Sequence, residues 1–496
     1  MTRTNEAQGL GQSAARGVLV TVGGQVVRLG LQVFGVVILS RLLTPGDFGL
    51  MAMIAVLITM GQAIRDFGLS NAAIQVPDIT DQQRTNLFWM NVALGVLVAA
   101  VACLTAPLVA GFYSAPELVP VILAMSSVFV IFGLMTQSRA HLARELRFGA
   151  LMITDVLPAV VGLILAVVFA ALGVGVWALV IQQVSIAGLG LVLAFGYDRW
   201  LPRLPRRDPR MGYFLKYGSF LTLSAIVASL SRNADYVILG YRFGPAATGF
   251  YTRAFELVIN PLNQINAPSS KVAVPVLSRL QDDRSRYDEF LLAGQKTMLA
   301  VLVPILVLGI VIADPLVQLV LGPEWASSAV LLQVLIVAAL CRVASYACYW
   351  VALSRGATRV DFLVNLVSAP LLIICVLIGS LEGVVGVAWG FSVATAFSWV
   401  IALVWYSRAA SAPGWKMFLN ACSTFSASVL PALVSAGVIS LVFAESSDLV
   451  KTSVGSIVFC LGLGAQAFFV PSYRRDWSNV VRVARLVRSR HGNSIS

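Results

Sequence analysis

The sequence predicts an all-α polytopic membrane protein with about fourteen transmembrane helices, in two pseudo-symmetric six-helix lobes followed by two appended helices. Hydrophobic residues make up 58% of the chain and charged residues only 12%, whereas soluble domains carry about 25% charged residues. Apolar windows of about 20 residues, long enough to cross a bilayer as helices, recur along the whole chain. A proline turn near residue 45 has an echo near residue 245, which indicates a duplication.

The apolar windows follow one another through the chain and are separated by short polar connections. They cover about 17–40, 49–71, 86–110, 118–138, 151–172, 175–196, 214–240, 248–274, 291–313, 327–353, 360–379, 383–406, 418–443 and 450–470. An even number of spans places both termini on the same side of the membrane.

The first two windows are joined by RLLTPGDFGLMAM (41–53), in which Pro45 and Gly46 favour a tight β-turn. RFGPAATGFYTRAF (242–255) has a proline and a glycine in the corresponding places. We therefore expect a hairpin of the same kind to lead each lobe.

A basic, proline-rich connection divides the chain, because its prolines prevent a continuous helix. The expected organisation is an N-terminal lobe (1–198), the connection (199–213), a C-terminal lobe (214–407), two additional helices (408–470) and an amphipathic basic tail (471–496).

Basic residues gather on the connections that lie on the side of the termini, as the positive-inside rule describes for cytoplasmic loops. The connections 111–118, 172–177 and 380–383, on the other side, carry none. The sequence therefore predicts that both termini are cytoplasmic. The net charge of +12 is explained by this asymmetry and needs no nucleic-acid partner.

Several functions are not expected. The six cysteines fall in apolar spans without metal-ligand spacing, and His141 and His491 lie outside the predicted spans. No Walker sequence precedes a helix, and no outer loop is large enough for a catalytic site. We expect neither a catalytic residue, nor a metal, nor a cofactor, and hence no enzyme.

Ionisable residues inside the spans are informative, because each costs about 2.5–3.5 kcal/mol at the bilayer centre. They concentrate in the leading hairpins and are mostly cationic. They are Arg28, Arg65, Arg232, Arg253, Lys271, Lys296 and Arg342 against Asp66, Asp155, Asp235 and Glu256. A cleft lined in this way would attract an anion, and a pyrophosphate fits arginine forks well.

We therefore predict substrate-binding residues in a lumen and acidic residues that couple transport to an ion. The binding candidates are Arg28, Arg65, Arg232, Arg253, Lys271 and Arg342, and the coupling candidates are Asp235, Glu256 and Asp66. The alternative is that some of these charges form structural pairs, Arg232 with Asp235 and Arg253 with Glu256.

Five segments carry a family resemblance: RLLTPGDFGLMAM (41–53), GLSNAAIQ (68–75), RELRFGAL (144–151), RNADYVILGYRFGPAATGFYTRAFEL (232–257) and PVLSRLQDD (275–283). The chain resembles Wzx-type polysaccharide-transport flippases of the multidrug/oligosaccharidyl-lipid/polysaccharide exporter superfamily, above all the capsule, colanic-acid and succinoglycan exporters. The resemblance implies two lobes around a cavity in the bacterial inner membrane. It also implies movement of undecaprenyl-pyrophosphate-linked oligosaccharide towards the periplasm for exopolysaccharide, capsule or O-antigen assembly.

Alternating access between the lobes would then carry the substrate, with H⁺ or Na⁺ as the possible coupling ion. Membrane lipids, a polysaccharide polymerase and a chain-length regulator are the further expected partners. The alternatives are a multidrug or ion antiporter of the same superfamily, a membrane polysaccharide polymerase or ligase, and a scaffold for the biosynthetic machinery.

Overall fold

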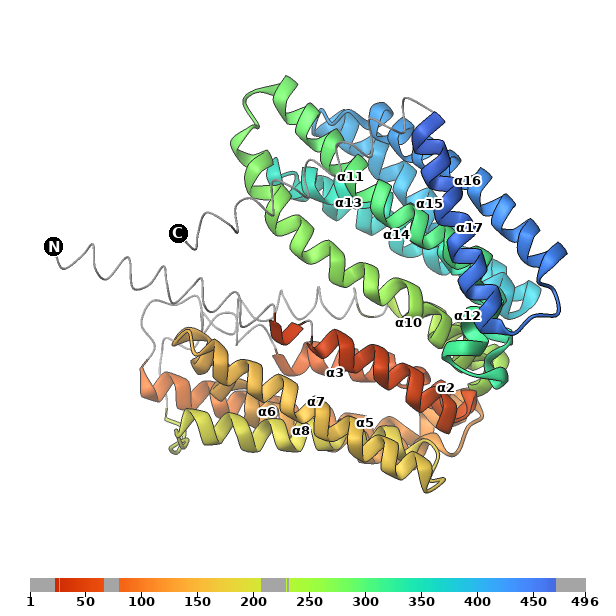
Figure 1. Ribbon diagram of the computed structural model, residues 1–496. Helices are drawn as coiled ribbons and strands as arrows, with labels where there is room; N and C mark the ends of the chain where they lie inside the picture. Colours follow the sequence, from red (N-terminus) through yellow and green to blue (C-terminus); the bar gives the residue numbers. More distant parts are fainter. Residues whose placement is uncertain (1–22, 26, 67–79, 207–228, 230–231, 470–496) are drawn as a thin grey trace, which may run out of the picture. The chain divides into compact units, whose positions relative to one another are not determined.

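The computed structural model describes residues 23–25, 27–66, 80–206, 229 and 232–469. Within these ranges the regular structure is helical throughout, without strands (Figure 1). The chain forms two compact units, Met1–Gly249 and Phe250–Ser496. The boundary predicted at the basic connection 199–213 stays a prediction.

The described part of the first unit contains six helical segments and the beginning of a seventh. They are the helix Gly23–Leu42, α2 (Pro45–Met53) with α3 (Ala55–Asp66), α5 (Asp81–Tyr113), α6 (Leu118–Arg144), α7 (Phe148–Ala171), α8 (Trp177–Asp198) and the start of α10 (Ala234–Arg279).

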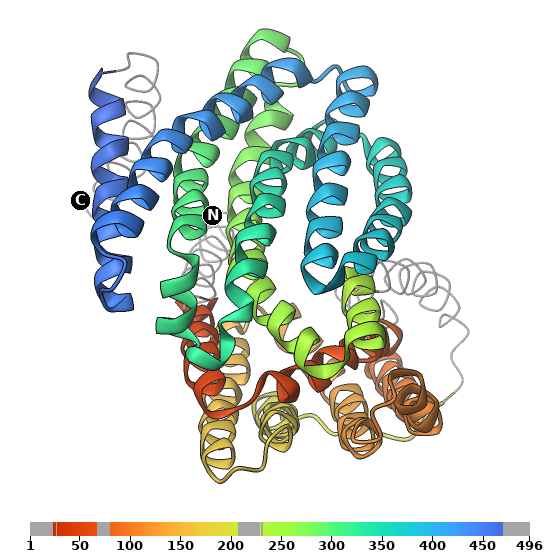
Figure 2. The same cartoon turned by 90° about the vertical axis from the view of Figure 1, so that its right-hand side faces the viewer.

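The second unit contains the rest of α10 and the helices that follow it. These are α11 (Arg284–Val311), α12 (Ala313–Val320), η1 (Pro323–Trp325), α13 (Ser327–Ser354), α14 (Thr358–Gly379), η2 (Ser380–Glu382), α15 (Gly383–Ala409), α16 (Gly414–Val442) and α17 (Asp448–Phe469). The two appended helices, α16 and α17, pack against each other and against α11 (Figure 2).

The predicted fold class is confirmed. Among the described residues, eleven stretches are long and apolar enough to cross a membrane, and one of them, Thr358–Ala409, covers both α14 and α15. The predicted count of about fourteen is roughly consistent with this. Most of the predicted window 214–240 lies outside the described residues.

The turn at Pro45 differs from the β-turn expected there. Thr44 is the N-cap of α2, and Pro45 is the first helical residue, where its missing N–H costs nothing. The Asp47 carboxylate accepts from the Thr44 backbone N–H at 2.9 Å, and the Thr44 hydroxyl accepts from the Asp47 N–H at 3.4 Å. The Asp47 N–H also donates to the Thr44 carbonyl oxygen at 3.1 Å, so the predicted turn around Pro45 and Gly46 forms, as the first turn of α2 and not as a separate β-turn.

The echo of this turn lies inside α10, whose helical path is interrupted at Gly244 (φ 77°). The helix resumes at Pro245, so this turn too has a proline directly after the break. The predicted helix start at residue 248 was therefore three residues late.

The two turns contact each other within the first unit. A Cβ atom on Gly49 would lie 1.7 Å from the Pro245 carbonyl oxygen, and one on Gly249 would lie 1.8 Å from that of Pro45. Each glycine thus lets the proline backbone of the other repeat approach more closely than any side chain would permit. The reciprocity supports the duplication that the two motifs predicted.

Small residues form the core of the first unit. Ala102, Ala106 and Ala110 recur along one face of α5 and are buried beside Leu118 and Ile122 of α6. Small side chains at this spacing let two apolar helices approach closely, which is how helices associate in lipid, where burial of apolar surface alone contributes little.

A buried ion-pair cluster closes one end of the first unit. Arg84 of α5 pairs with Asp198 of α8, and the Asp198 carboxylate also lies 2.8 Å from Nδ1 of His141. The Arg84 guanidinium stacks 4.0 Å from the centre of the Trp200 ring. Helix α6 continues to Arg144, so His141 lies within this helix, beyond the predicted window 118–138.

Candidate functional site

The first unit contains a cavity of about 790 Å³ that is lined by the helix Gly23–Leu42, α3, α6, α7 and α8. The helix Gly23–Leu42, α6, α7 and α8 present residues spaced by three or four positions, as expected for one face of a helix, and α3 contributes Gln62. Its polar and charged lining residues are Arg28, Gln32, Gln62, Thr136, Arg139, Thr154, Asp155, Gln182 and Gln183. Its apolar lining includes Leu31, Phe132, Leu163 and Ile186.

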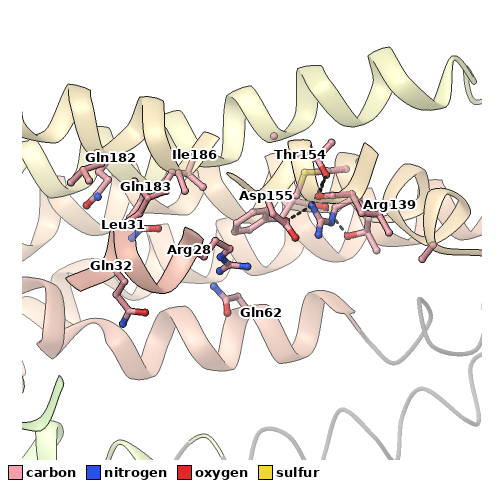
Figure 3. A pocket seen from close by; sticks show the side chains of 18 of the residues that line it. Arg28, Leu31, Gln32, Gln62, Arg139, Thr154, Asp155, Gln182, Gln183 and Ile186 are labelled. Atoms are coloured by element: carbon pink, nitrogen blue, oxygen red, sulfur yellow. Dashed lines mark hydrogen bonds and ion pairs between the residues drawn. The ribbon is translucent and has the colours of Figure 1, made fainter. Parts of the chain in front are cut away.

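Arg28 is the predicted binding residue that lines this cavity. Its side chain is exposed, and it forms no ion pair with any described residue. Figure 3 shows its guanidinium group directed towards the Gln62 amide of α3. Its positive charge is therefore available to a ligand.

Arg139 is a second cation in the cavity, but its charge is compensated. Its guanidinium group lies 2.8 Å from the Asp155 carboxylate and donates to the Thr154 hydroxyl at 3.2 Å (Figure 3). These contacts join α6 to α7. The lining therefore carries two positive charges and one negative charge, a net charge of +1.

Arg232 and Asp235, the other candidates of the first unit whose side chains are described, do not line this cavity. Arg65 and Asp66 are the last two residues of α3, and their side chains lie outside the described part of the chain. Arg232 is exposed, whereas Asp235 is 1% exposed and accepts from the backbone N–H of Tyr236 at 3.0 Å. No ion pair joins Arg232 to Asp235 among the described residues.

The remaining candidates lie in the second unit. Arg253 and Glu256 form an ion pair of 2.5 Å, which is the structural pairing considered as the alternative. Arg342 donates to the Asn263 side chain at 2.9 Å. Lys271 is exposed, and Lys296 is half-buried.

Sequence reasoning missed most of the cavity. Arg139 was assigned to a connection because the predicted span ended at residue 138, whereas α6 ends at Arg144. The glutamines were overlooked because only ionisable residues were sought. The adjacent pair Gln182 and Gln183, inside an apolar run, is the signal that could have found the site.

No three His, Cys, Asp or Glu side chains gather closely enough to hold a metal ion within the described ranges. The cavity can instead offer hydrogen bonds and one positive charge. Helices long and apolar enough to span a membrane, with a polar and net cationic cavity in the first unit, are the architecture of a membrane transport protein.

The chain belongs to the polysaccharide biosynthesis protein family, whose match covers residues 38–330. It is 26% identical to the lipopolysaccharide biosynthesis protein WzxC of Escherichia coli (strain K12), over 74% of this chain and 75% of that relative. It is 28% identical to the teichuronic acid biosynthesis protein TuaB of Bacillus subtilis (strain 168), over 57% of this chain and 59% of that relative. It is 23% identical to the succinoglycan biosynthesis transport protein ExoT of Rhizobium meliloti (strain 1021), over 66% of this chain and 65% of that relative.

Two solved structures share the fold. The lipid II flippase MurJ, in an inward closed conformation, matches with a TM-score of 0.69 at 14% identity, over 91% of this chain and 99% of that one. A multidrug resistance MATE family transporter of the MOP superfamily, in an inward-facing conformation, matches with a TM-score of 0.59 at 14% identity, over 81% of this chain and 99% of that one. At this identity the two structures show a common fold alone.

Proposed function

We propose that the chain is a flippase that moves an undecaprenyl-pyrophosphate-linked oligosaccharide repeat across the bacterial inner membrane by alternating access. The uncompensated charge of Arg28 in the first-unit cavity carries this proposal, together with membership of the polysaccharide biosynthesis family. Charged residues within membrane spans are retained where they face the bundle interior or a water-filled cavity, and there they mark substrate or ion pathways.

Relatives with related tasks support the substrate class. WzxC, TuaB and ExoT are named for lipopolysaccharide, teichuronic acid and succinoglycan biosynthesis, and ExoT is named as a transport protein. The net positive lining disfavours the antiporter alternative, because a cationic drug would be repelled by Arg28. The proposed role is therefore transport and not catalysis, with both termini in the cytoplasm.

Arg232 is proposed as a further anion-binding group, because its side chain is exposed. Asp235 and Glu256 remain the proposed coupling residues for H⁺ or Na⁺. Asp235 is the stronger of the two, since it is 1% exposed, whereas the Glu256 side chain is 28% exposed. Arg65, Lys271 and Arg342 complete the proposed lumen, with Asp66 as a third coupling residue.

The test uses a strain in which the chromosomal gene is deleted and replaced by a variant. Arg28→Ala and Arg232→Ala should each lower polymer export at least tenfold and cause lipid-linked repeats to accumulate. Arg286→Ala is the matched control, because Arg286 is 75% exposed and pairs only with Asp283 of its own helical turn. Full export by both lumen variants, at normal protein levels, would contradict the proposed roles of these arginines.

A further inference from the structure

Three glutamine side chains of the cavity are available to a ligand. Gln62 of α3 and Gln182 and Gln183 of α8 line it, and none hydrogen-bonds another described residue. Each amide can donate two hydrogen bonds and accept two. Gln183 is exposed and Gln62 and Gln182 are half-buried, so their amides face the shared cavity with donors and acceptors that a polar ligand can use.

We propose that this cavity is a saccharide subsite that takes one sugar residue carrying a single carboxylate, of the hexuronic-acid type. The inference rests on the proposed flippase function and refines it. It places part of the oligosaccharide, and not the pyrophosphate, next to Arg28.

Hydrogen-bond chemistry distinguishes the two parts of the substrate. Pyrophosphate oxygens accept hydrogen bonds at neutral pH and donate almost none, so they would leave the glutamine carbonyl oxygens without donors. A sugar hydroxyl both donates and accepts. A ring with several hydroxyls can therefore satisfy both ends of Gln62, Gln182 and Gln183 together.

The charge of the lining sets the charge of the ligand. Asp155 compensates Arg139 across a 2.8 Å ion pair, which leaves Arg28 as the uncompensated cation among the described lining residues. One carboxylate balances one guanidinium group and can receive two parallel N–H bonds from it. A pyrophosphate would bring at least one more negative charge than this lining neutralises.

The size and the apolar lining agree with a sugar. The cavity volume of about 790 Å³ lies within the range of about 300–1,000 Å³ that is usual for small-ligand pockets. Leu31, Phe132 and Leu163 provide apolar surface for the C–H faces of a pyranose ring. The site thus combines apolar walls with a few convergent polar groups, as ligand pockets do.

The test measures binding to the full chain in lipid nanodiscs by isothermal titration calorimetry. The probes are D-glucuronate, D-glucose and inorganic pyrophosphate. D-glucuronate should bind more tightly than D-glucose, and the double variant Gln182→Leu/Gln183→Leu should weaken both sugars at least tenfold. Gln333→Leu is the matched control, because Gln333 belongs to α13 of the second unit and donates to the Ile310 carbonyl oxygen at 3.2 Å.

A second variant guards against loss of folding. Gln62→Glu places a negative charge opposite Arg28, so it should abolish the preference for D-glucuronate over D-glucose. Pyrophosphate affinity should be unchanged in the Gln182→Leu/Gln183→Leu double variant, because pyrophosphate is not the ligand of this subsite. The subsite is refuted if the wild type binds neither sugar, or if Gln333→Leu weakens sugar binding as much as the Gln182→Leu/Gln183→Leu double variant does. It is also refuted if the double variant weakens pyrophosphate binding.

Translocation of the lipid-linked repeat in proteoliposomes separates this inference from the proposed function. Wild-type translocation without sugar binding would refute the subsite and leave the flippase intact. Sugar binding without translocation of any lipid-linked saccharide would contradict the flippase and leave only a saccharide-binding cavity.

Discussion

The turn between α6 and α7 has the same backbone conformation as the turn between α13 and α14, but the side chains of the two helix pairs differ. The first pair breaks between Arg144 and Phe148, and the second between Ser354 and Thr358, a shift of 210 residues in both cases. Leu146 (φ 56°) and Gly356 (φ 62°), also 210 residues apart, both adopt the left-handed conformation. The backbone of the turn is thus repeated in the two units.

The side chains of the two pairs have diverged. Arg139 and Asp155 form an ion pair across α6 and α7, whereas the positions 210 residues later hold Tyr349 and Asn365, which carry no charge. Asn365 instead donates to Asp361, one turn earlier in α14, at 3.2 Å. The comparison teaches that a duplicated scaffold can keep its turns while only one copy places charges on a cavity wall.

A buried ion pair between two charged side chains stabilises one end of the first unit, and the largest predicted loss of stability follows from breaking it. Asp198 is fully buried and pairs with Arg84, whose side chain is 8% exposed. Asp198→Ala would leave a buried guanidinium unpaired, which costs about 3–5 kcal/mol. We expect a much lower thermal unfolding midpoint in detergent.

The corresponding end of the second unit relies on Arg355, which stacks 4.1 Å from the centre of the Tyr287 ring and donates to the Ala410 carbonyl oxygen. The control for Asp198→Ala is Asp282→Ala, since Asp282 is exposed and forms no ion pair with any described residue. Equal midpoints for the two variants would show that Asp198 does not stabilise the fold.

The reciprocal contact of the two proline turns should be sensitive to one methyl group. Gly49→Ala and Gly249→Ala would each force a Cβ atom against a proline carbonyl oxygen, with an expected cost of about 1–3 kcal/mol in unfolding free energy. Gly46→Ala is the control, because its nearest neighbour would be the Thr44 hydroxyl at 3.6 Å. If only one of the two glycines is sensitive, the turns are not equivalent.

The shared left-handed turn can be tested by exchanging its residues. Gly356→Leu should destabilise the second unit by about 1–2 kcal/mol, the cost of the left-handed region for a residue with a Cβ atom. Leu146→Gly should relieve the same strain and raise the unfolding midpoint slightly. A stabilising effect of Gly356→Leu would mean that the two turns obey different constraints.

In the second unit, a hydrogen bond from an uncharged donor joins α14 to α15. The Tyr406 hydroxyl donates to the Asp361 carboxylate at 2.9 Å. Tyr406→Phe removes one hydrogen bond to a charged group, and we expect the free energy of unfolding to fall by about 1.5–3 kcal/mol. Double-mutant analysis with Asp361→Asn measures the coupling, and additive effects of the two substitutions would show that the bond contributes nothing.

The smallest change in stability is expected at the ion pair that distinguishes the first unit. Arg139 and Asp155 are 29% and 33% exposed, so Asp155→Asn should cost less than about 1 kcal/mol. The same substitution raises the net charge of the cavity and should tighten binding of D-glucuronate severalfold. Asn365→Asp is the matched change in the second unit and should leave that affinity unaltered.

The sequence by itself determined the membrane class, the helical fold and the duplication. Long apolar windows are direct evidence of helical spans, because a helix satisfies its backbone hydrogen bonds within one segment inside a bilayer. The motif around Pro45 and its echo at Pro245 could be compared by position alone. The capping of α2 by Thr44 and Asp47 was also readable from the sequence, although the prediction favoured the turn potential of Pro45 and Gly46 instead.

Only the tertiary structure decided which polar residues meet. The rotation of α6, α7 and α8 about their own axes is set by packing against neighbours, and a shift of a few residues at a helix end moves Arg139 from a connection into a cavity wall. Ionisable residues were found in the sequence because their burial is costly. Gln62, Gln182 and Gln183 were not, since neutral amides are tolerated in many places and become a site only where several helices bring them together.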